Sequence, residues 1–453
     1  MKKAEITAFL SLIFILLVTF IGSVVDAASI QVAKNYRRID AERALECVFA
    51  EYQKELLEKY DIFALDAGYE NGDYKENLLF KRLEHYGLVN SEKAIERIQF
   101  LTDDSAKAFM EQVSFYMEHK YGLDIVEDSL GNISIWEDQD SDSEEYVKEE
   151  SQNREYLEDL LKENNGELSS ENNPIAHVDI LKKTPVLKLV VPEEKVVSEK
   201  TLDLSLLPSG RELNKGYGDF SDKEKHTSIT DRLLFGEYVL EHFSCFTDEA
   251  EHILDYEVEY MIAGKGSDRE NLQNVVNKLL LLRFVPNYAY VQSSSDKRAE
   301  AEALAITLSS VLAVPAITEA VAQGILLAWA FGESVVDIRG LLDGNKVPLV
   351  KDSGSWQLSL SGLLKLGEYG DVNDGADASE GLSYEEYLKI LLYLNEKEET
   401  AMRGLDLIEQ NLQKIEGIDF FRVDLCISKI EIESRCSFRR GITYTFPTYF
   451  GYQ

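Results

Sequence analysis

The chain has 453 residues, of which 45% are hydrophobic and 10% aromatic, so it can bury a substantial core and is not intrinsically disordered. Its 82 acidic and 47 basic residues give a formal net charge of −35, which repels nucleic-acid phosphates and anionic lipid head groups. Nucleic-acid binding is therefore not expected. Four cysteines are too few for a scaffold built on disulfides.

The amino-terminal segment is an uncharged apolar run, residues 6–25, preceded by Lys2 and Lys3. At ~1.5 Å per helical residue, about twenty residues span the ~30 Å hydrocarbon layer of a bilayer. Lysines tend to stay in the cytoplasm, so the chain that follows would be delivered outside the cell. We expect residues 1–26 to be a single-pass transmembrane anchor in the cell membrane, with a cytoplasmic amino terminus and the bulk of the chain extracellular.

A cleavable signal peptide is the alternative interpretation of this segment. Val25, Asp26 and Ala27 resemble a signal peptidase site. The apolar run is, however, longer than the usual hydrophobic region of a signal peptide, and helical patterning continues beyond it. Both alternatives stay open at the level of the sequence.

A stalk helix is predicted next. From Ala27 to Tyr60 the chain has no Gly or Pro, and apolar residues recur at three- and four-residue steps. One helix of about 55 residues, roughly 80 Å long, would join the membrane to the outer part, unless a break near Asp26 divides it in two. Small helices over residues 61–125 would pack beside it, so residues 27–125 form the expected extracytoplasmic stalk unit.

Residues 126–175 are predicted to be an acidic linker or insertion, because acidic and amide residues dominate there and aliphatic residues are few. A short helical stretch is expected within it at residues 154–162. Beyond the linker, the apolar run Pro185–Pro192 is bracketed by prolines, which is typical of a short edge strand.

The outer domain is expected over residues 176–453, with its larger part starting near Ser228. Capping residues support its helices: Ser267 or Asp268 for one, Asp296 for the next, and Pro315 in the first turn of a third. Apolar alternation in the closing segment predicts a small antiparallel sheet, which makes the whole an α+β fold with helix in the majority. The helices are expected at Ile229–Phe243, Asp268–Val291, Lys297–Leu312, Pro315–Leu342, Tyr384–Leu394 and Thr400–Ile415, and the sheet at Phe420–Phe446.

Two further features bear on topology and on disulfide bonding. The run Ala316–Gly332 is interrupted by polar residues and is predicted to be a buried helix, not a second membrane crossing. Cys426 and Cys436 lie in a segment that looks like two strands, where a disulfide would be possible in an oxidising compartment. Four reduced thiols are the alternative.

The architecture of an apolar helix, an amphipathic continuation and an outer domain resembles that of TadE/TadG-like, pilin-related proteins. Four stretches are similar to those of an uncharacterised family of Gram-positive bacterial proteins: EITAFLSLIFILL, RALECVFAEYQKELLEKYDIFALD, YEVEYMIAGKGSDRENL and LLAWAFGESVVDIRGLL. The resemblance implies membrane anchoring and a link to Tad-type pilus or secretion machinery, but that family has no established activity. Glu5 invites comparison with the Glu that pilins place near the start of their helix, but the pilin processing motif is absent, and a simple charge at the membrane interface is the alternative interpretation.

The search for catalytic chemistry is mostly negative. The six histidines form no zinc-binding pair, the Walker pattern fails at Glu259, and no nucleophile elbow occurs, so no catalytic residue and no cofactor are expected. Asp138, Asp140, Asp142 and Glu149 follow the spacing of an EF-hand-type calcium loop and are weak candidate metal ligands. An acidic solvated linker is the alternative interpretation of these four residues.

Three hypotheses about function follow. The first is a non-enzymatic, membrane-anchored surface protein that assembles with other membrane or pilus-type proteins of the envelope. The second is a secreted or surface enzyme, for example a cell-wall glycan hydrolase, with a carboxylate site that sequence cannot identify. The third is a ligand-sensing ectodomain. The partner and the oligomeric state are not predicted.

Overall fold

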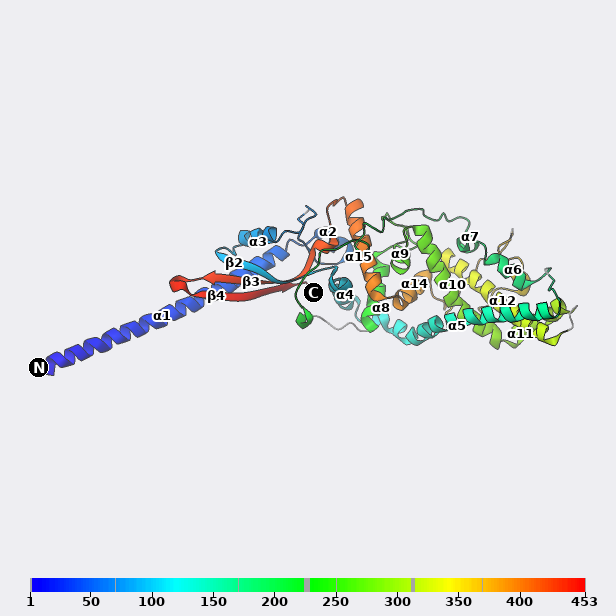
Figure 1. Ribbon diagram of the computed structural model, residues 1–453, viewed down its shortest axis with the longest axis horizontal. Coiled ribbons are helices and arrows are strands. Elements are labelled where there is room, and N and C mark those ends of the chain that lie inside the picture. Colours follow the sequence, from blue (N-terminus) through cyan, green and yellow to red (C-terminus); the bar gives the residue numbers. More distant parts are fainter. Residues whose placement is uncertain are drawn as a thin grey trace. The chain divides into compact units, whose positions relative to one another are not determined.

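The computed structural model describes residues 2–69, 71–169, 171–223, 229–249, 251–310, 314–368 and 370–452 (Figure 1). It is an α+β fold in which helices predominate, as predicted. The chain forms two units: unit 1 consists of Met1–Gln112, Glu212–His226 and Leu412–Gln453, and unit 2 consists of Val113–Arg211 and Thr227–Asn411. The expected domains were consecutive stretches, whereas the chain leaves unit 1 and returns to it twice.

Unit 1 contains a four-stranded antiparallel sheet. The strand β3 is central, and β1, β2 and β4 all pair with it. Two helices belong partly to this unit, since the chain passes into unit 2 within α4 (Asp103–Tyr121) and comes back within α15 (Lys397–Lys414). The other elements are α1 (Lys2–Phe49), α2 (Lys54–Tyr60), β1 (Leu65–Asp66), α3 (Glu76–His85), β2 (Ser91–Phe100), β3 (Cys426–Ser437) and β4 (Thr443–Gly451).

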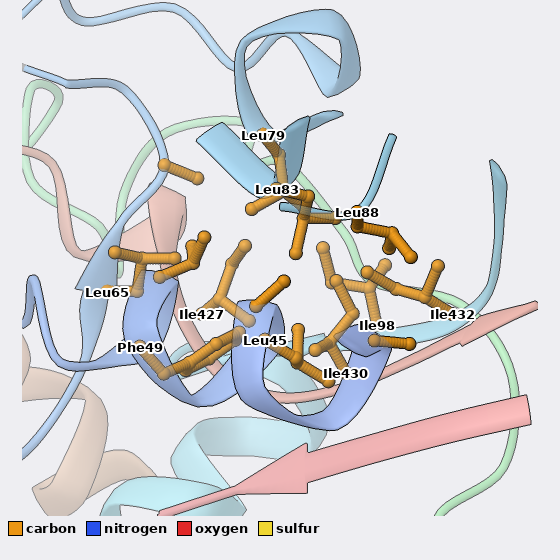
Figure 2. Packing of buried hydrophobic residues seen from close by; sticks show 14 of the residues in the cluster. Leu45, Phe49, Leu65, Leu79, Leu83, Leu88, Ile98, Ile427, Ile430 and Ile432 are labelled. Carbon is orange, nitrogen blue, oxygen red and sulfur yellow. The ribbon is translucent and has the colours of Figure 1, made fainter. Parts of the chain in front are cut away.

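The core of unit 1 lies where the second half of α1 and the helix α3 pack on the sheet. Figure 2 shows Leu45 and Phe49 of α1 beside Ile427 and Ile430 of β3, with Leu83 of α3 close by. Each of these side chains is at most 2% exposed. Burying an aliphatic or aromatic side chain of this size stabilises a fold by about 1.5–3 kcal/mol, so this cluster fixes the last turns of α1 to the sheet.

The continuous helix predicted for the stalk is observed only as far as Phe49. The helix ends there, and a new helix, α2, begins at Lys54 with Gln53 as its amino-terminal cap. The prediction of small helices over residues 61–125 is wrong for β2, a strand whose first seven side chains alternate between half-buried and exposed. Glu92 and Glu96 lie on the exposed side of this alternation, whereas Lys93 and Arg97 lie on the half-buried side and form ion pairs. Pairing with β3 outweighs the helix propensity of these residues.

The predicted disulfide between Cys426 and Cys436 is also wrong. Both residues lie on the single strand β3, where Cys426 is opposite Asp66 and Cys436 is opposite Tyr444 and Ser91. Ten residues of extended strand separate their Cα atoms by more than 30 Å, far beyond the span of a disulfide. All four cysteines carry free thiols.

Unit 2 is helical. Its long helices α5, α10, α11 and α12 run alongside one another (Figure 1) and bury a common apolar core. Its helices are α5 (Glu127–Glu163), α6 (Pro174–Leu181), α7 (Val186–Val190), α8 (Ile229–His242), α9 (Glu257–Ala263), α10 (Asp268–Ser293), α11 (Ser295–Ser309), α12 (Pro315–Asp343), α13 (Leu360–Leu363) and α14 (Tyr384–Leu394). Short 3-10 turns lie at Asp124–Val126 (η1) in unit 2 and at Ser221–Lys223 (η2), Val423–Leu425 (η3) and Arg439–Gly441 (η4) in unit 1.

The residues predicted to mark the starts of α10 and α12 do so, whereas the one predicted for α11 does not. Ser267 caps α10 through its side chain, and Pro315 stands in the first turn of α12. The cap of α11 is Ser294, not Asp296, because the side chain of Ser294 accepts the N–H of Lys297 at 3.4 Å. The expected end of this helix at Leu312 and the expected start of the outer domain near Ser228 lie outside the described residues.

Two segments of unit 2 differ from prediction. The acidic stretch predicted as a flexible linker forms the long helix α5, whose Trp136 and Leu157 are buried. Few apolar residues suffice because they fall on the side that packs against α10, α12 and α14. The run between Pro185 and Pro192 forms the short helix α7, not a strand. A proline directly before a helix does not interrupt its hydrogen bonds.

Candidate functional site

The first half of α1 is an apolar surface without cover from the described chain. From Glu5 to Phe49 the helix contains a stretch long and apolar enough to cross a membrane, and none of that stretch is buried. Phe9, Phe14 and Phe20 are 65%, 67% and 65% exposed. Leaving such side chains in water costs about 1–2 kcal/mol each, which adds up to tens of kcal/mol over the whole run. A bilayer, or the machinery that receives a signal sequence, removes this cost.

The second half of α1 fixes the apolar segment to unit 1. The ammonium of Lys34 lies 4.8 Å from the ring centre of Tyr444 on β4, and the guanidinium of Arg37 donates to the backbone carbonyl of Val89 at 3.3 Å. From Ala41 onward one side of the helix is buried in the core. Lys34 lies nine positions after residue 25 on the same unbroken helix, so its contact with Tyr444 is about 13 Å beyond the apolar run.

An exposed apolar face continues along α1 past the apolar run. Val32, Tyr36 and Ile39 are 52%, 64% and 54% exposed. Because they are spaced by four and three residues, they share one side of the helix, which is opposite the side that buries Ala41 and Val48. The stalk therefore carries two apolar sides: one is used by its own unit, and the other is available to another helix or protein.

The candidate calcium ligands do not form a loop. Asp138, Asp140, Asp142 and Glu149 all lie on α5, a continuous helix. In a helix, Asp140 points to the side opposite Asp138 and Asp142, and Glu149 lies about 16 Å further along the axis than Asp138. Four oxygens so placed cannot surround one ion. Glu149 instead accepts a hydrogen bond from the hydroxyl of Tyr288 at 3.1 Å.

A different group of side chains lies close enough together to hold a metal ion. The ligand atoms of Cys245, Asp248 and Glu385 are all within 4.8 Å of one another. Two of them already have a local role, since Asp248 accepts the N–H of Cys245 at 2.8 Å and the thiol lies 3.1 Å from the hydroxyl of Thr247. Burial raises the pKa of the Cys245 thiol, which keeps it protonated rather than a thiolate ligand. Sequence reasoning missed this group because Glu385 is far from Cys245 in the chain.

Two buried carboxyl groups have the raised pKa values that acid catalysts use. Burial raises the pKa of Glu259 to about 7 and that of Asp406 to about 6. One oxygen of Glu259 accepts the N–H of Phe246 at 2.9 Å and the hydroxyl of Tyr384 at 2.8 Å. Asp406 accepts from Ser209 and Tyr260. Both side chains are fully buried, and neither lines the apolar groove of about 320 Å³ beside α5, α7 and α10.

A second buried network joins α10 and α12 and is ionic. Arg283 and Lys351 pair with Asp337 at 3.1 and 2.7 Å, and Lys351 also pairs with Glu333 at 2.6 Å. All four side chains are fully buried. Two positive and two negative charges balance, and Asn287 donates a further hydrogen bond to Asp337 at 3.0 Å. The arrangement holds the helices of unit 2 together and leaves no charge for a substrate.

These features define a mostly helical α+β protein whose described residues include an apolar helix, α1, that is long enough to span a membrane. The chain belongs to DUF5702, a family of unknown function, whose model matches residues 164–438, more than half of the chain. The matched residues include most of unit 2 and part of the sheet of unit 1 but not α1. The prediction of an uncharacterised family is confirmed, while the match names neither a source organism nor a pilus relationship. No curated protein and no solved structure matches the chain.

Proposed function

We propose that this protein is a single-pass, membrane-anchored surface protein without enzymatic activity, which assembles with other envelope proteins through its stalk. The observation that carries the proposal is the exposed apolar half of α1, which continues without a break into a helix fixed to a folded core. A helix of this kind holds unit 1 at a set distance from the bilayer. A cleavable leader does not need such a connection to the mature fold.

The orientation follows from charge. Lys2 and Lys3 precede the apolar run and favour a cytoplasmic amino terminus, which places both units outside the cell. The resemblance of this layout to TadE/TadG-like proteins, and the similarity of four stretches to Gram-positive proteins, support a pilus-type or secretion assembly in such a cell envelope as the setting. The free thiols are compatible with either side of the membrane.

The exposed side of the stalk is the proposed contact with a partner. Val32, Tyr36 and Ile39 present an apolar stripe about 10 Å long at one side of α1, close to the membrane surface in the proposed topology. Stripes with this spacing pack against a second helix. The fully buried positions of Glu259 and Asp406 give no support to the alternative of a carboxylate-dependent glycan hydrolase.

Photo-crosslinking in cells tests the proposal. A photoreactive amino acid at Tyr36 is expected to give a discrete higher-mass adduct in the membrane fraction. The matched control carries the same amino acid at Arg38, an exposed position on a different side of the same helix, and is expected to give much less adduct. A protein that stays uncrosslinked at Tyr36, or that high salt releases from the membrane, would contradict the assembly role.

A further inference from the structure

The hairpin formed by β3 and β4 lies along the stalk helix, and its turn points toward the amino-terminal end of α1 (Figure 1). Two contacts align the hairpin with the helix. The rings of Phe49 and Phe450 have centres 4.4 Å apart, and the ammonium of Lys34 lies 4.8 Å from the ring centre of Tyr444. From Lys34 to Phe49 the helix rises about 22 Å, and from Tyr444 to Phe450 the strand rises about 20 Å. The strand β4 therefore runs nearly parallel to α1, and positions on the strand can be matched to positions on the helix.

This alignment places the turn of the hairpin close to the level at which the apolar run ends. Gly441 precedes Tyr444 by three residues, which is about 10 Å of strand, and about 10 Å of helix leads from Lys34 back to about residue 27. The apolar run ends at residue 25. Lipid head groups extend about 5–7 Å beyond the hydrocarbon layer. If α1 spans the bilayer as proposed above, the turn therefore lies among the head groups.

The turn holds an exposed arginine at the end of the hairpin. The N–H of Phe438 donates to the carbonyl oxygen of Ile442 at 2.8 Å and closes the loop. Gly441 has a φ of 71°, which glycine adopts without strain, so the chain can reverse within residues 438–442. The ring of Phe438 packs partly on the core of unit 1, whereas the side chain of Arg439 is exposed. Arg439 is thus presented on a backbone that is fixed to the core.

The charge of this end of unit 1 is opposite in sign to that of the whole chain. Residues 26–39 and 435–445 contain six basic residues and one acidic residue, Asp26, although the chain has a net charge of −35. Glu92 lies opposite Arg435 in the sheet and pairs with it at 3.8 Å, so it offsets the charge of Arg435 but not that of the turn. Guanidinium groups bind phosphate through paired hydrogen bonds. A basic end at this level fits the phosphate groups of lipids.

We propose that the turn Arg439–Gly441 binds the head groups of anionic phospholipids beside the protein's own membrane anchor. The inference rests on the proposed membrane anchoring and adds a second contact with the bilayer. The acidic remainder of the chain is repelled by the same lipids, so the attraction at this end favours a stalk whose hairpin lies against the bilayer. One basic side chain near an anionic surface strengthens binding about fivefold, and the effect falls off within a Debye length of about 8–10 Å.

Hydrogen exchange measured by mass spectrometry on the full chain in lipid nanodiscs tests the proposal. Discs of phosphatidylcholine alone are compared with discs that also contain phosphatidylglycerol, which carries a net negative charge. Peptides that cover residues 438–445 are expected to exchange about fivefold more slowly in the anionic discs, and about 0.5 M salt should remove most of this difference. Equal exchange in the two kinds of disc would overturn the proposal while leaving the anchor intact. A chain that enters neither kind of disc would overturn the anchoring as well.

The variant Arg439→Glu separates the charge of the turn from folding. Its side chain is exposed, so the variant should leave exchange in the rest of the sheet unchanged, while the protection by anionic lipid is lost. Lys54→Glu is the matched control, because Lys54 is an exposed lysine of unit 1 on α2. The helix α1 rises about 36 Å from residue 25 to Phe49 before α2 begins, so Lys54 is beyond the reach of head-group charge. Loss of protection in both variants, or in neither, would contradict the assignment of the site to the turn.

Discussion

Two apolar helices of this chain have opposite surroundings. In α12, Ile325, Trp329 and Val335 are fully buried, because α5, α10 and α11 cover the helix. In the first half of α1, Ile13 and Phe14 are 43% and 67% exposed, and no described element covers them. Their composition also differs, because polar residues such as Glu319 and Gln323 interrupt α12, whereas residues 6–25 of α1 carry no charge. The difference teaches that an apolar helix requires a cover, which the fold supplies for α12 and a bilayer would supply for α1.

The largest effect is expected from opening the ionic network between α10 and α12. Asp337→Ala leaves Arg283 and Lys351 with one carboxylate between them in a fully buried site, so the free energy of unfolding of unit 2 should fall by about 3–5 kcal/mol. Tryptophan fluorescence during denaturation reports on unit 2 alone, because all three tryptophans of the chain (Trp136, Trp329 and Trp356) lie there.

The control for this variant is an exposed ion pair of the same unit. On α5, the Nζ atom of Lys162 lies 3.7 Å from the Oε2 atom of Glu158, and the two side chains are 72% and 60% exposed. Because water screens such a pair, Glu158→Ala should change stability by less than about 0.5 kcal/mol. If the two variants lost similar stability, the network would not be the element that holds the helices together.

Matched truncations of one isoleucine in each helix sharpen the comparison directly. Ile325→Ala opens a cavity in a fully buried site of α12 and should lower the stability of unit 2 by about 2–4 kcal/mol. Ile13→Ala removes the same atoms from α1, where the described chain makes no cavity, and should leave the unfolding of both units unchanged. A loss of stability with Ile13→Ala would mean that the apolar half of α1 packs on the folded units.

A smaller effect depends on pH. The pKa of Glu259 is about 7 in the fold and near 4.5 when unfolded, so the folded state binds the proton more tightly. The folded state then loses stability as pH rises from about 4.5 to 7, by about 3 kcal/mol from this group. Glu259→Gln should flatten this part of the profile of denaturation midpoint against pH. An unchanged slope would show that Glu259 titrates normally.

The sequence predicts the helices well where periodicity and capping agree. The helices α8, α10, α12 and α14 start within a residue or two of their predicted positions. A capping residue or proline marks the start of α10, α12 and α14 locally. The helix α5 could not be recognised, since its buried side is narrow and most of its residues are acidic. The strand β2 was missed because partner residues more than three hundred positions away decide its structure.

The basic turn of unit 1 could not be placed from the sequence for the same reason. Only the packing of β4 on α1 brings the turn to the level at which the apolar run ends. The signal that was available is the excess of basic residues in residues 26–39 and 435–445 of a strongly acidic chain. The four acidic residues with calcium-loop spacing, in contrast, could bind an ion only if they lay on a loop, and they lie on the helix α5.

Membrane anchoring requires that the apolar segment stays attached and lies in a bilayer. Mass spectrometry of the intact protein, purified from membranes after alkaline carbonate extraction, tests it most directly. We expect the protein to resist extraction and its mass to include residues 6–25. A mature chain that begins near Ala28 and is found free in the medium would contradict the account.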